Sequence, residues 1–121
     1  MEHRPLRGTY WKVVELGGAK VAVSDRVQEP HLNFSASELR VSGSSGCNRL
    51  MGSFEHQGAA LKFGPLAGTR MACLEPALAS QEQQIFTQLQ RVRSYRIHGD
   101  DLALLDATGQ VSLKLQSVML R

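Results

Sequence analysis

The sequence predicts an α+β protein that is mainly antiparallel β, with a curled or barrel-like sheet of about seven to eight strands and one packed α-helix at about residues 76–92. Short segments in which apolar and polar residues alternate are separated by turns rich in glycine, a pattern typical of antiparallel strands. One stretch has helical periodicity, and strands are expected both before and after it. This order excludes a parallel α/β fold, in which strands and helices alternate.

Length and composition indicate a single domain over residues 1–121, with 42% hydrophobic residues, enough for a buried core. No apolar run approaches the roughly 20 residues of a membrane helix. The net charge is +3, and the basic residues are spread along the chain. A nucleic-acid-binding protein more often gathers such residues on one face, so nucleic acid is not an expected partner. We interpret the densest group, Arg91, Arg93 and Arg96, as the solvated end of the helix and start of the next strand.

Six β segments are expected before the helix. The first, 9–16, contains a tyrosine, a tryptophan and two valines, which favour strands. The others are a weak segment and two alternating segments, then a pair: 20–23, 31–34, 38–42, 50–56 and 59–63. The pair flanks Gly58, which can adopt a positive φ, so a hairpin is expected. Small residues at 43–46 and the Gly-Pro pair at 64–65 are expected to end strands, and a long loop then leads to Cys73.

The helix and three closing strands follow. Pro76 suits the first helical turn, where the missing N–H has no intrahelical acceptor. Four apolar residues at helical spacing, with Phe86 beside them, predict one buried face: Leu78, Ile85, Leu89 and Val92. The polar face is rich in glutamine rather than lysine, which disfavours binding to anionic lipid. The strands expected at 94–98, 101–105 and 110–118 alternate as a half-buried antiparallel meander does.

The only two cysteines, Cys47 and Cys73, each lie in an expected loop. If the protein is exported, a disulfide between them is favoured and would add roughly 3 kcal/mol of stability. In a reducing cytosol they would be free thiols that pack as small hydrophobes. Zinc is disfavoured because there is no Cys-x-x-Cys and the histidines are scattered: His3, His31, His56 and His98. A nucleophile built on Cys47 is disfavoured because His31 or His56 would have to reach it.

Four residues beside the cysteines are candidates for interaction: Asn48, Arg49, Thr69 and Arg70. The side chains of Asn48 and Thr69 can bond to nearby backbone and hold a loop in shape, and contact with a ligand is the alternative. Arg49 and Arg70 carry the only charges of the two loops. They would form a small anion-accepting patch if the loops converge, and are otherwise solvated. No catalytic residue, metal ligand or phosphate-binding glycine motif is identified.

Trp11 and two longer segments, 42–52 and 61–73, resemble the META domain, also called HslJ-like. The segments contain a Gly-Cys-Asn motif at 46–48 and a Thr-x-Met-x-Cys motif at 69–73. Other residues fall where the helix and closing strands of that family would place them: Glu82, Phe86, Leu89, Tyr95, Leu102 and Leu104. The resemblance covers about residues 6–115.

The resemblance implies a small β-rich fold with one helix, found mostly in bacterial envelope proteins or lipoproteins. The heat-inducible bacterial namesake is linked to novobiocin resistance, and a parasite relative to virulence. The cysteines of the family map onto Cys47 and Cys73, which supports a structural pairing. The family has no established catalytic residues to carry over.

We therefore expect a non-enzymatic domain of the bacterial cell envelope that aids stress or antibiotic tolerance by binding an unknown protein or envelope component, without a cofactor or metal. The expected location is the periplasm or the outer membrane, with a lipid anchor upstream. Because the sequence shows no export signal at its start, a cytoplasmic location is the alternative. Two other functions stay open: a thiol-dependent enzyme or redox sensor that uses Cys47, and a carrier of small hydrophobic ligands.

Overall fold

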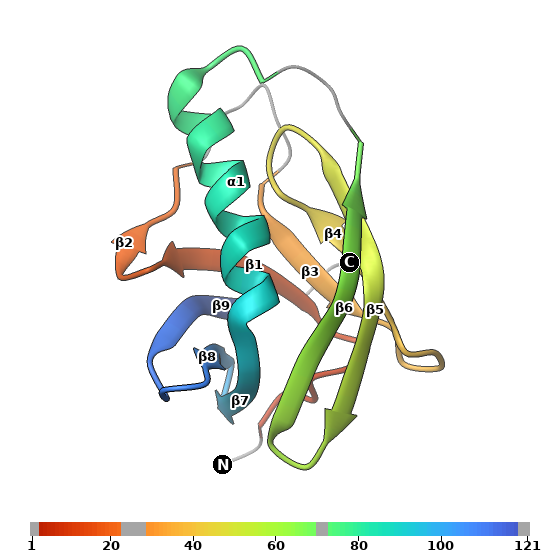
Figure 1. Cartoon of the computed structure of the whole chain (residues 1–121). Coiled ribbons are helices and arrows are strands. Elements are labelled where there is room, and N and C mark those ends of the chain that lie inside the picture. The colour runs from red at the N-terminus through yellow and green to blue at the C-terminus, as the bar shows by residue number, and fades with distance from the viewer. Residues whose placement is uncertain (1–2, 23–28, 70–72, 119–121) are drawn as a thin grey trace.

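The computed structural model describes residues 3–22, 29–69 and 73–118, and these contain nine strands and one helix (Figure 1). The elements are β1 (Tyr10–Leu16), β2 (Ala19–Lys20), β3 (His31–Phe34), β4 (Arg40–Ser44), β5 (Arg49–Gln57), β6 (Ala60–Gly68), α1 (Pro76–Arg91), β7 (Val92–His98), β8 (Asp101–Asp106) and β9 (Val111–Val118).

The strands form one antiparallel sheet in the order β2-β1-β3-β4-β5-β6-β7-β8-β9, and β1 also pairs with β9. The sheet therefore closes on itself as a barrel of eight strands, and β2 is an extra strand paired to the end of β1. The pairing of β1 with β9 covers edges that these two strands would otherwise expose, and exposed strand edges promote aggregation. The predicted antiparallel, barrel-like sheet with one packed helix is confirmed.

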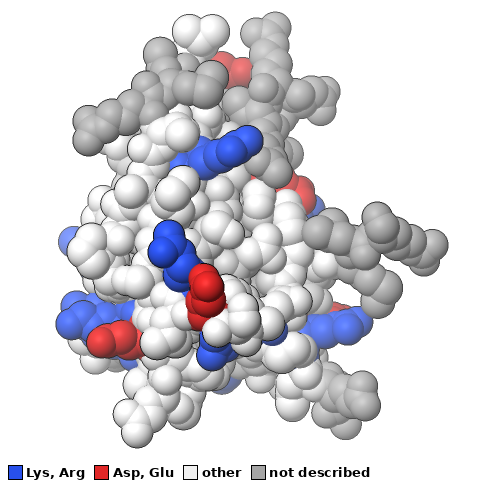
Figure 2. Space-filling view, turned by 90° about the vertical axis from the view of Figure 1, so that its right-hand side faces the viewer, with Lys and Arg blue, Asp and Glu red and all other residues white. Residues whose placement is uncertain are grey.

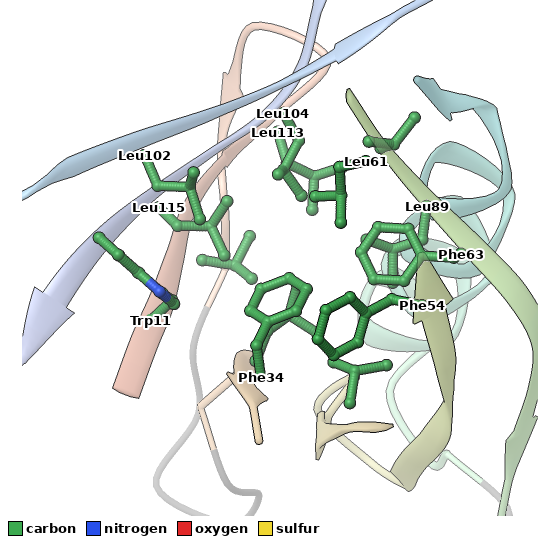
Figure 3. Packing of buried hydrophobic residues seen from close by; sticks show 14 of the residues in the cluster. Trp11, Phe34, Phe54, Leu61, Phe63, Leu89, Leu102, Leu104, Leu113 and Leu115 are labelled. Atoms are coloured by element: carbon green, nitrogen blue, oxygen red, sulfur yellow. The ribbon is translucent and has the colours of Figure 1, made fainter. Parts of the chain in front are cut away.

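The interior of the barrel is filled by apolar side chains that reach inward from opposite walls (Figure 3). In β5, buried Leu50 and Phe54 alternate with exposed neighbours, as period-two strands require. The ring of Phe34, from β3, meets that of Phe54 edge-on, with centroids 5.1 Å apart. Each buried side chain of this size stabilises the fold by roughly 1.5–3 kcal/mol through loss of contact with water.

Helix α1 covers the place where β6 and β7 diverge (Figure 1). Among the described residues, the register of these two strands holds a single pair, Ala60 with Ser94, beside a hydrogen bond from the Tyr95 N–H to the Ala59 carbonyl. Beyond that point α1 packs against β6 and β9 and buries one face: Leu78, Ile85 and Leu89. The predicted amphipathic helix is confirmed, and its apolar face completes the wall of the core.

Two predicted strand ends are wrong, because both strands continue past the residues expected to stop them. β4 continues through Gly43 to Ser44, because Gly43 serves a close approach of strands rather than a turn: a Cβ there would collide with the His31 carbonyl oxygen. β6 continues past Pro65 to Gly68 through a β-bulge, in which Gly64 and Pro65 together lie opposite one residue of β5. A bulge accommodates proline, which cannot donate to the ladder.

Smaller differences occur at the ends of other elements. The segment expected at 20–23 forms the two-residue strand β2, and residue 23 lies outside the described part of the chain. The helix ends at Arg91, and β7 begins at Val92 without an intervening loop. Arg93 donates to the carbonyl oxygens of Gln90 and Val92 at 2.9 and 2.7 Å, a favourable position for a cation near a helix C-terminus.

Candidate functional site at the disulfide

The two cysteine loops meet at one end of the barrel. Cys47 lies in the turn between β4 and β5, Cys73 precedes α1, and the two form a disulfide. Their Cα atoms are 5.6 Å apart, within the range that disulfides require. The disulfide thus joins the β4–β5 turn to the segment that begins the helix.

The turn that carries Cys47 is built by two buried serines. The Ser45 N–H donates to the Asn48 carbonyl at 2.9 Å, and the Ser45 hydroxyl donates to the same oxygen at 3.2 Å. The Ser44 hydroxyl accepts from the Gly46 N–H at 3.0 Å. Gly46 has a φ of +115°, where a residue with a side chain would be strained. The small residues that seemed only to end a strand therefore shape the turn that presents Cys47.

A chain of side-chain hydrogen bonds joins this turn to β6 and α1. The Arg49 N–H donates to the Thr69 hydroxyl at 3.0 Å, and that hydroxyl donates to Asn48 Oδ1 at 2.9 Å. Asn48 Nδ2 then donates to Glu82 Oε1 at 2.8 Å. Asn48 is only 7% exposed. Its amide connects side chains of segments far apart in the sequence, whereas its residue type had suggested bonds to nearby backbone or contact with a ligand.

Glu82 is the residue of the site that the sequence reasoning missed. One of its carboxylate oxygens, Oε2, is buried and has no hydrogen-bond partner among the described residues. A carboxylate oxygen of Glu82 and the sulfur atoms of Cys47 and Cys73 all lie within 4.8 Å of one another. Its position in the sequence could have identified it. Glu82 lies four residues after Leu78 and three before Ile85, so it is an acidic residue on the buried face of the helix.

Of the two arginines expected to form the patch, the structure describes one. Arg49 begins β5 with an exposed side chain. Arg70 lies outside the described residues, so the expected anion-accepting patch stays a prediction. The apolar side chain of Leu74, next to the disulfide, is 89% exposed. On the face shown in Figure 2, lysine and arginine side chains are separated from one another, and acidic side chains lie beside some of them.

Neither histidine proposed as a partner for Cys47 makes a described contact with it. His31 Nδ1 lies 3.0 Å from the Glu29 carbonyl oxygen, and its ring stacks on Tyr10. His56 Nε2 lies 2.8 Å from the Tyr95 hydroxyl. With its sulfur in the disulfide, Cys47 carries no thiol in this state, so the described arrangement holds no Cys–His nucleophile.

Fold and site together define a class of protein: a small closed antiparallel barrel with one helix over its seam and a disulfide at one end. The chain matches the META domain over residues 4–118. It therefore belongs to the META domain family, as the motifs around its cysteines indicated. Comparison with curated proteins found no match.

Solved structures share this fold. An NMR structure of a protein from Burkholderia xenovorans is 29% identical, with a TM-score of 0.75 over 95% of this chain and 85% of the other. A second NMR structure is 25% identical, with a TM-score of 0.71 over 92% and 90% of the two chains. A crystal structure of a duf4847 family protein from Bacteroides vulgatus, 12% identical, shares the fold alone, with a TM-score of 0.64 over 96% of each chain.

Two observations bear on location. Disulfides persist mainly in oxidising compartments, so the Cys47–Cys73 bond is consistent with an extracytoplasmic domain. Within the described ranges, α1 does not have the length and hydropathy that a membrane-crossing helix needs, and no other helix is present there.

Proposed function

We propose that this domain is a non-enzymatic module of the bacterial cell envelope, in the periplasm or attached to the outer membrane, and that it binds a protein or envelope component through the disulfide end of the barrel. The observation that carries the proposal is that this end is tied together internally while Arg49 and Leu74 remain exposed. A contribution to stress or antibiotic tolerance is part of the proposal and comes from the family resemblance.

The internal bonds support binding because they order the surface before a partner arrives. The disulfide and the chain of bonds from Thr69 through Asn48 to Glu82 hold the β4–β5 turn against β6 and α1, and a turn held in this way loses less conformational entropy on association. Leu74 supports it in another way. Leu74 is 89% exposed, so its side chain stabilises the fold very little. Covering such an apolar side chain with a partner removes it from water and so favours association.

The two other functions have less support. The barrel interior is lined by packed side chains, including fully buried Trp11, Phe34 and Phe54, so the carrier hypothesis would require this core to open (Figure 3). The thiol-dependent enzyme or redox sensor would require the disulfide to be reduced, and the described site then lacks a contacting histidine. We therefore favour a binding module over an enzyme.

The test is a pair of matched double variants in a bacterium that lacks its own copy of the gene. Arg49→Glu with Leu74→Ser changes the proposed surface. Arg40→Glu with Leu39→Ser makes the same exchanges at the opposite end of β4, where Leu39 is 52% exposed. The measurements are the yield of cross-linked adducts in intact cells and survival under novobiocin and heat.

The first variant is expected to lose the adduct and the tolerance of the wild type, and the second to keep both. Thermal melts of the purified variants check that each is folded. If the first variant cross-links and protects as the wild type does, the binding surface does not lie at the disulfide end.

A further inference from the structure

The two carboxylate oxygens of Glu82 differ in their hydrogen bonding. Its Oε1 accepts from Asn48 Nδ2 at 2.8 Å, whereas its Oε2 is buried and has no hydrogen-bond partner among the described residues. Burying a carboxylate oxygen without a partner is unfavourable, and such a group in a native structure calls for an explanation, such as a redox or catalytic role, an ordered water or a bound ion. The position of Oε2 therefore calls for a ligand, and the nearby groups indicate which kind.

We propose that reduction of the Cys47–Cys73 disulfide creates a zinc site whose ligands are the two thiolates and the Glu82 carboxylate. The two sulfur atoms and one carboxylate oxygen of Glu82 lie within 4.8 Å of one another. Zinc binds thiolate sulfur at about 2.3 Å and carboxylate oxygen at about 2.0–2.2 Å. Once reduction has broken the sulfur–sulfur bond, rotation of the two cysteine side chains would separate the sulfurs to fit around the metal. The mixed set of two soft sulfurs and one harder oxygen suits Zn²⁺ better than Cu⁺.

Neighbouring hydrogen bonds orient the carboxylate for this role. The Thr69 hydroxyl donates to Asn48 Oδ1, which turns Nδ2 of the same amide toward Glu82. Thr69 is itself held by the Arg49 N–H, which donates to its hydroxyl. Oε1 is thereby held by Asn48 and Oε2 is left to bind the metal. Partners of this kind commonly fix the orientation of metal ligands.

The disulfide makes the site dependent on redox state. A dithiol reductant transfers two electrons and two protons to the sulfurs, which gives two cysteine thiols and leaves the reductant as its own disulfide. Binding of Zn²⁺ then releases the two thiol protons, because the thiolate is the ligand. In the oxidised state the sulfurs are bonded to each other and cannot serve as thiolate ligands. Three protein ligands leave the fourth zinc position open to water.

The test uses Co²⁺ as a spectroscopic substitute for Zn²⁺, added to the whole protein after reduction with a phosphine and removal of the reductant. Reduced wild type is expected to bind one equivalent, with a thiolate-to-cobalt charge-transfer band that Zn²⁺ abolishes by displacement. The oxidised protein should show no such band. Glu82→Gln keeps an oxygen that can accept from Asn48, so the fold is retained, and it should weaken binding by about tenfold or more.

Glu75→Gln is the matched control, because Glu75 is exposed and its side chain makes no capping hydrogen bond to the helix. This variant should bind as the wild type does. Near-ultraviolet circular dichroism follows the fold throughout, and if reduction unfolds the chain, Zn²⁺ should restore the native signal. The proposal is overturned if reduced protein gives no charge-transfer band, if Zn²⁺ fails to restore a lost fold, or if Glu82→Gln binds as tightly as Glu75→Gln.

Discussion

Asn48 shows how one side chain links segments that the sequence separates. Its amide oxygen accepts from Thr69, and its amide nitrogen donates to Glu82 on the helix. A buried amide of this kind can be removed only by leaving its partners without hydrogen bonds, which typically costs about 1–3 kcal/mol. The site at the disulfide is therefore part of the structural framework as well as a candidate for binding.

Thr69→Val tests this framework with almost no change in side-chain shape. The substitution removes the bonds from the Arg49 N–H and to Asn48 Oδ1, so we expect the free energy of unfolding to fall by about 0.5–1.5 kcal/mol in urea titrations. Thr87→Val, on the exposed side of α1, is the control and should change it by less than about 0.5 kcal/mol. Equal effects of the two substitutions would mean that the chain of hydrogen bonds adds no stability.

The raised pKa of Tyr10 leads us to expect a loss of stability at alkaline pH. Partial burial, followed by the hydrogen bond to Glu29 and the negative charge of that residue, raises the pKa of Tyr10 from 10.0 to about 12. The stability that protonated Tyr10 contributes is therefore fully present below the pKa of the unfolded chain and is lost as the pH rises through the pKa of the folded protein. Urea titrations at pH 9 and pH 11 should show a smaller decline for Tyr10→Phe than for wild type. The same decline in both would contradict this assignment.

At the scale of elements, α1 is the part that the sequence predicted most directly. Its periodicity placed Leu78, Ile85 and Leu89 on one face, and all three are buried. The same periodicity placed Glu82 on that face, but a lone acidic residue within an apolar stripe does not reveal which group it meets. The partner, Asn48, lies 34 positions away, and only the packing of α1 on the barrel brings the two together.

Leu89 and Leu74 form a matched pair that tests how α1 is held. Leu89 has no exposed surface, and Leu74 is 89% exposed just before the helix. Leu89→Ala removes core contacts and leaves a cavity, so we expect it to lower the free energy of unfolding by about 2–5 kcal/mol. Leu74→Ala should change it by less than about 0.5 kcal/mol. Thermal and urea unfolding measure both. A small effect of Leu89→Ala would show that α1 adds little to the core.

The strands β4 and β6 show why element boundaries were harder to predict. Glycine and proline ordinarily mark the ends of strands, and at Gly43 and at Gly64-Pro65 they were interpreted in that way. In the structure, Gly43 makes room for the backbone of β3, and Gly64-Pro65 form a bulge. Both roles depend on a neighbouring strand, which a local sequence pattern does not identify.

At the scale of the whole molecule, the barrel is closed at two places of different character. β1 and β9 pair along most of their length, whereas β6 and β7 meet through one register pair among the described residues and are covered by α1. The Cys47–Cys73 disulfide adds a covalent link between the β4–β5 turn and the chain that enters the helix. Closure thus combines backbone pairing, helix packing and one cross-link.

Replacing both cysteines by alanine tests how far the fold depends on that link. The sequence separation of 26 residues corresponds to a loss of about 3–4 kcal/mol when the unfolded chain is no longer restricted. We expect the variant to keep the near-ultraviolet circular dichroism of the wild type and to unfold at a lower urea concentration, because the core is complete without the disulfide. Loss of the native spectrum would show that the barrel requires the cross-link.

The sequence by itself determined the fold class, the helix, the family and the two cysteine motifs, because each depends on local periodicity or on residues close together in the chain. It also pointed to Asn48 and Thr69 as residues that hold a loop in shape or contact a ligand, and the Thr69 hydroxyl accepts from the Arg49 N–H. Only the tertiary structure decided the closure of β1 on β9, the bulged path of β6 and the meeting of Glu82 with the disulfide. These features arise where segments distant in sequence are brought into contact, and the spacing along the chain does not specify such contacts.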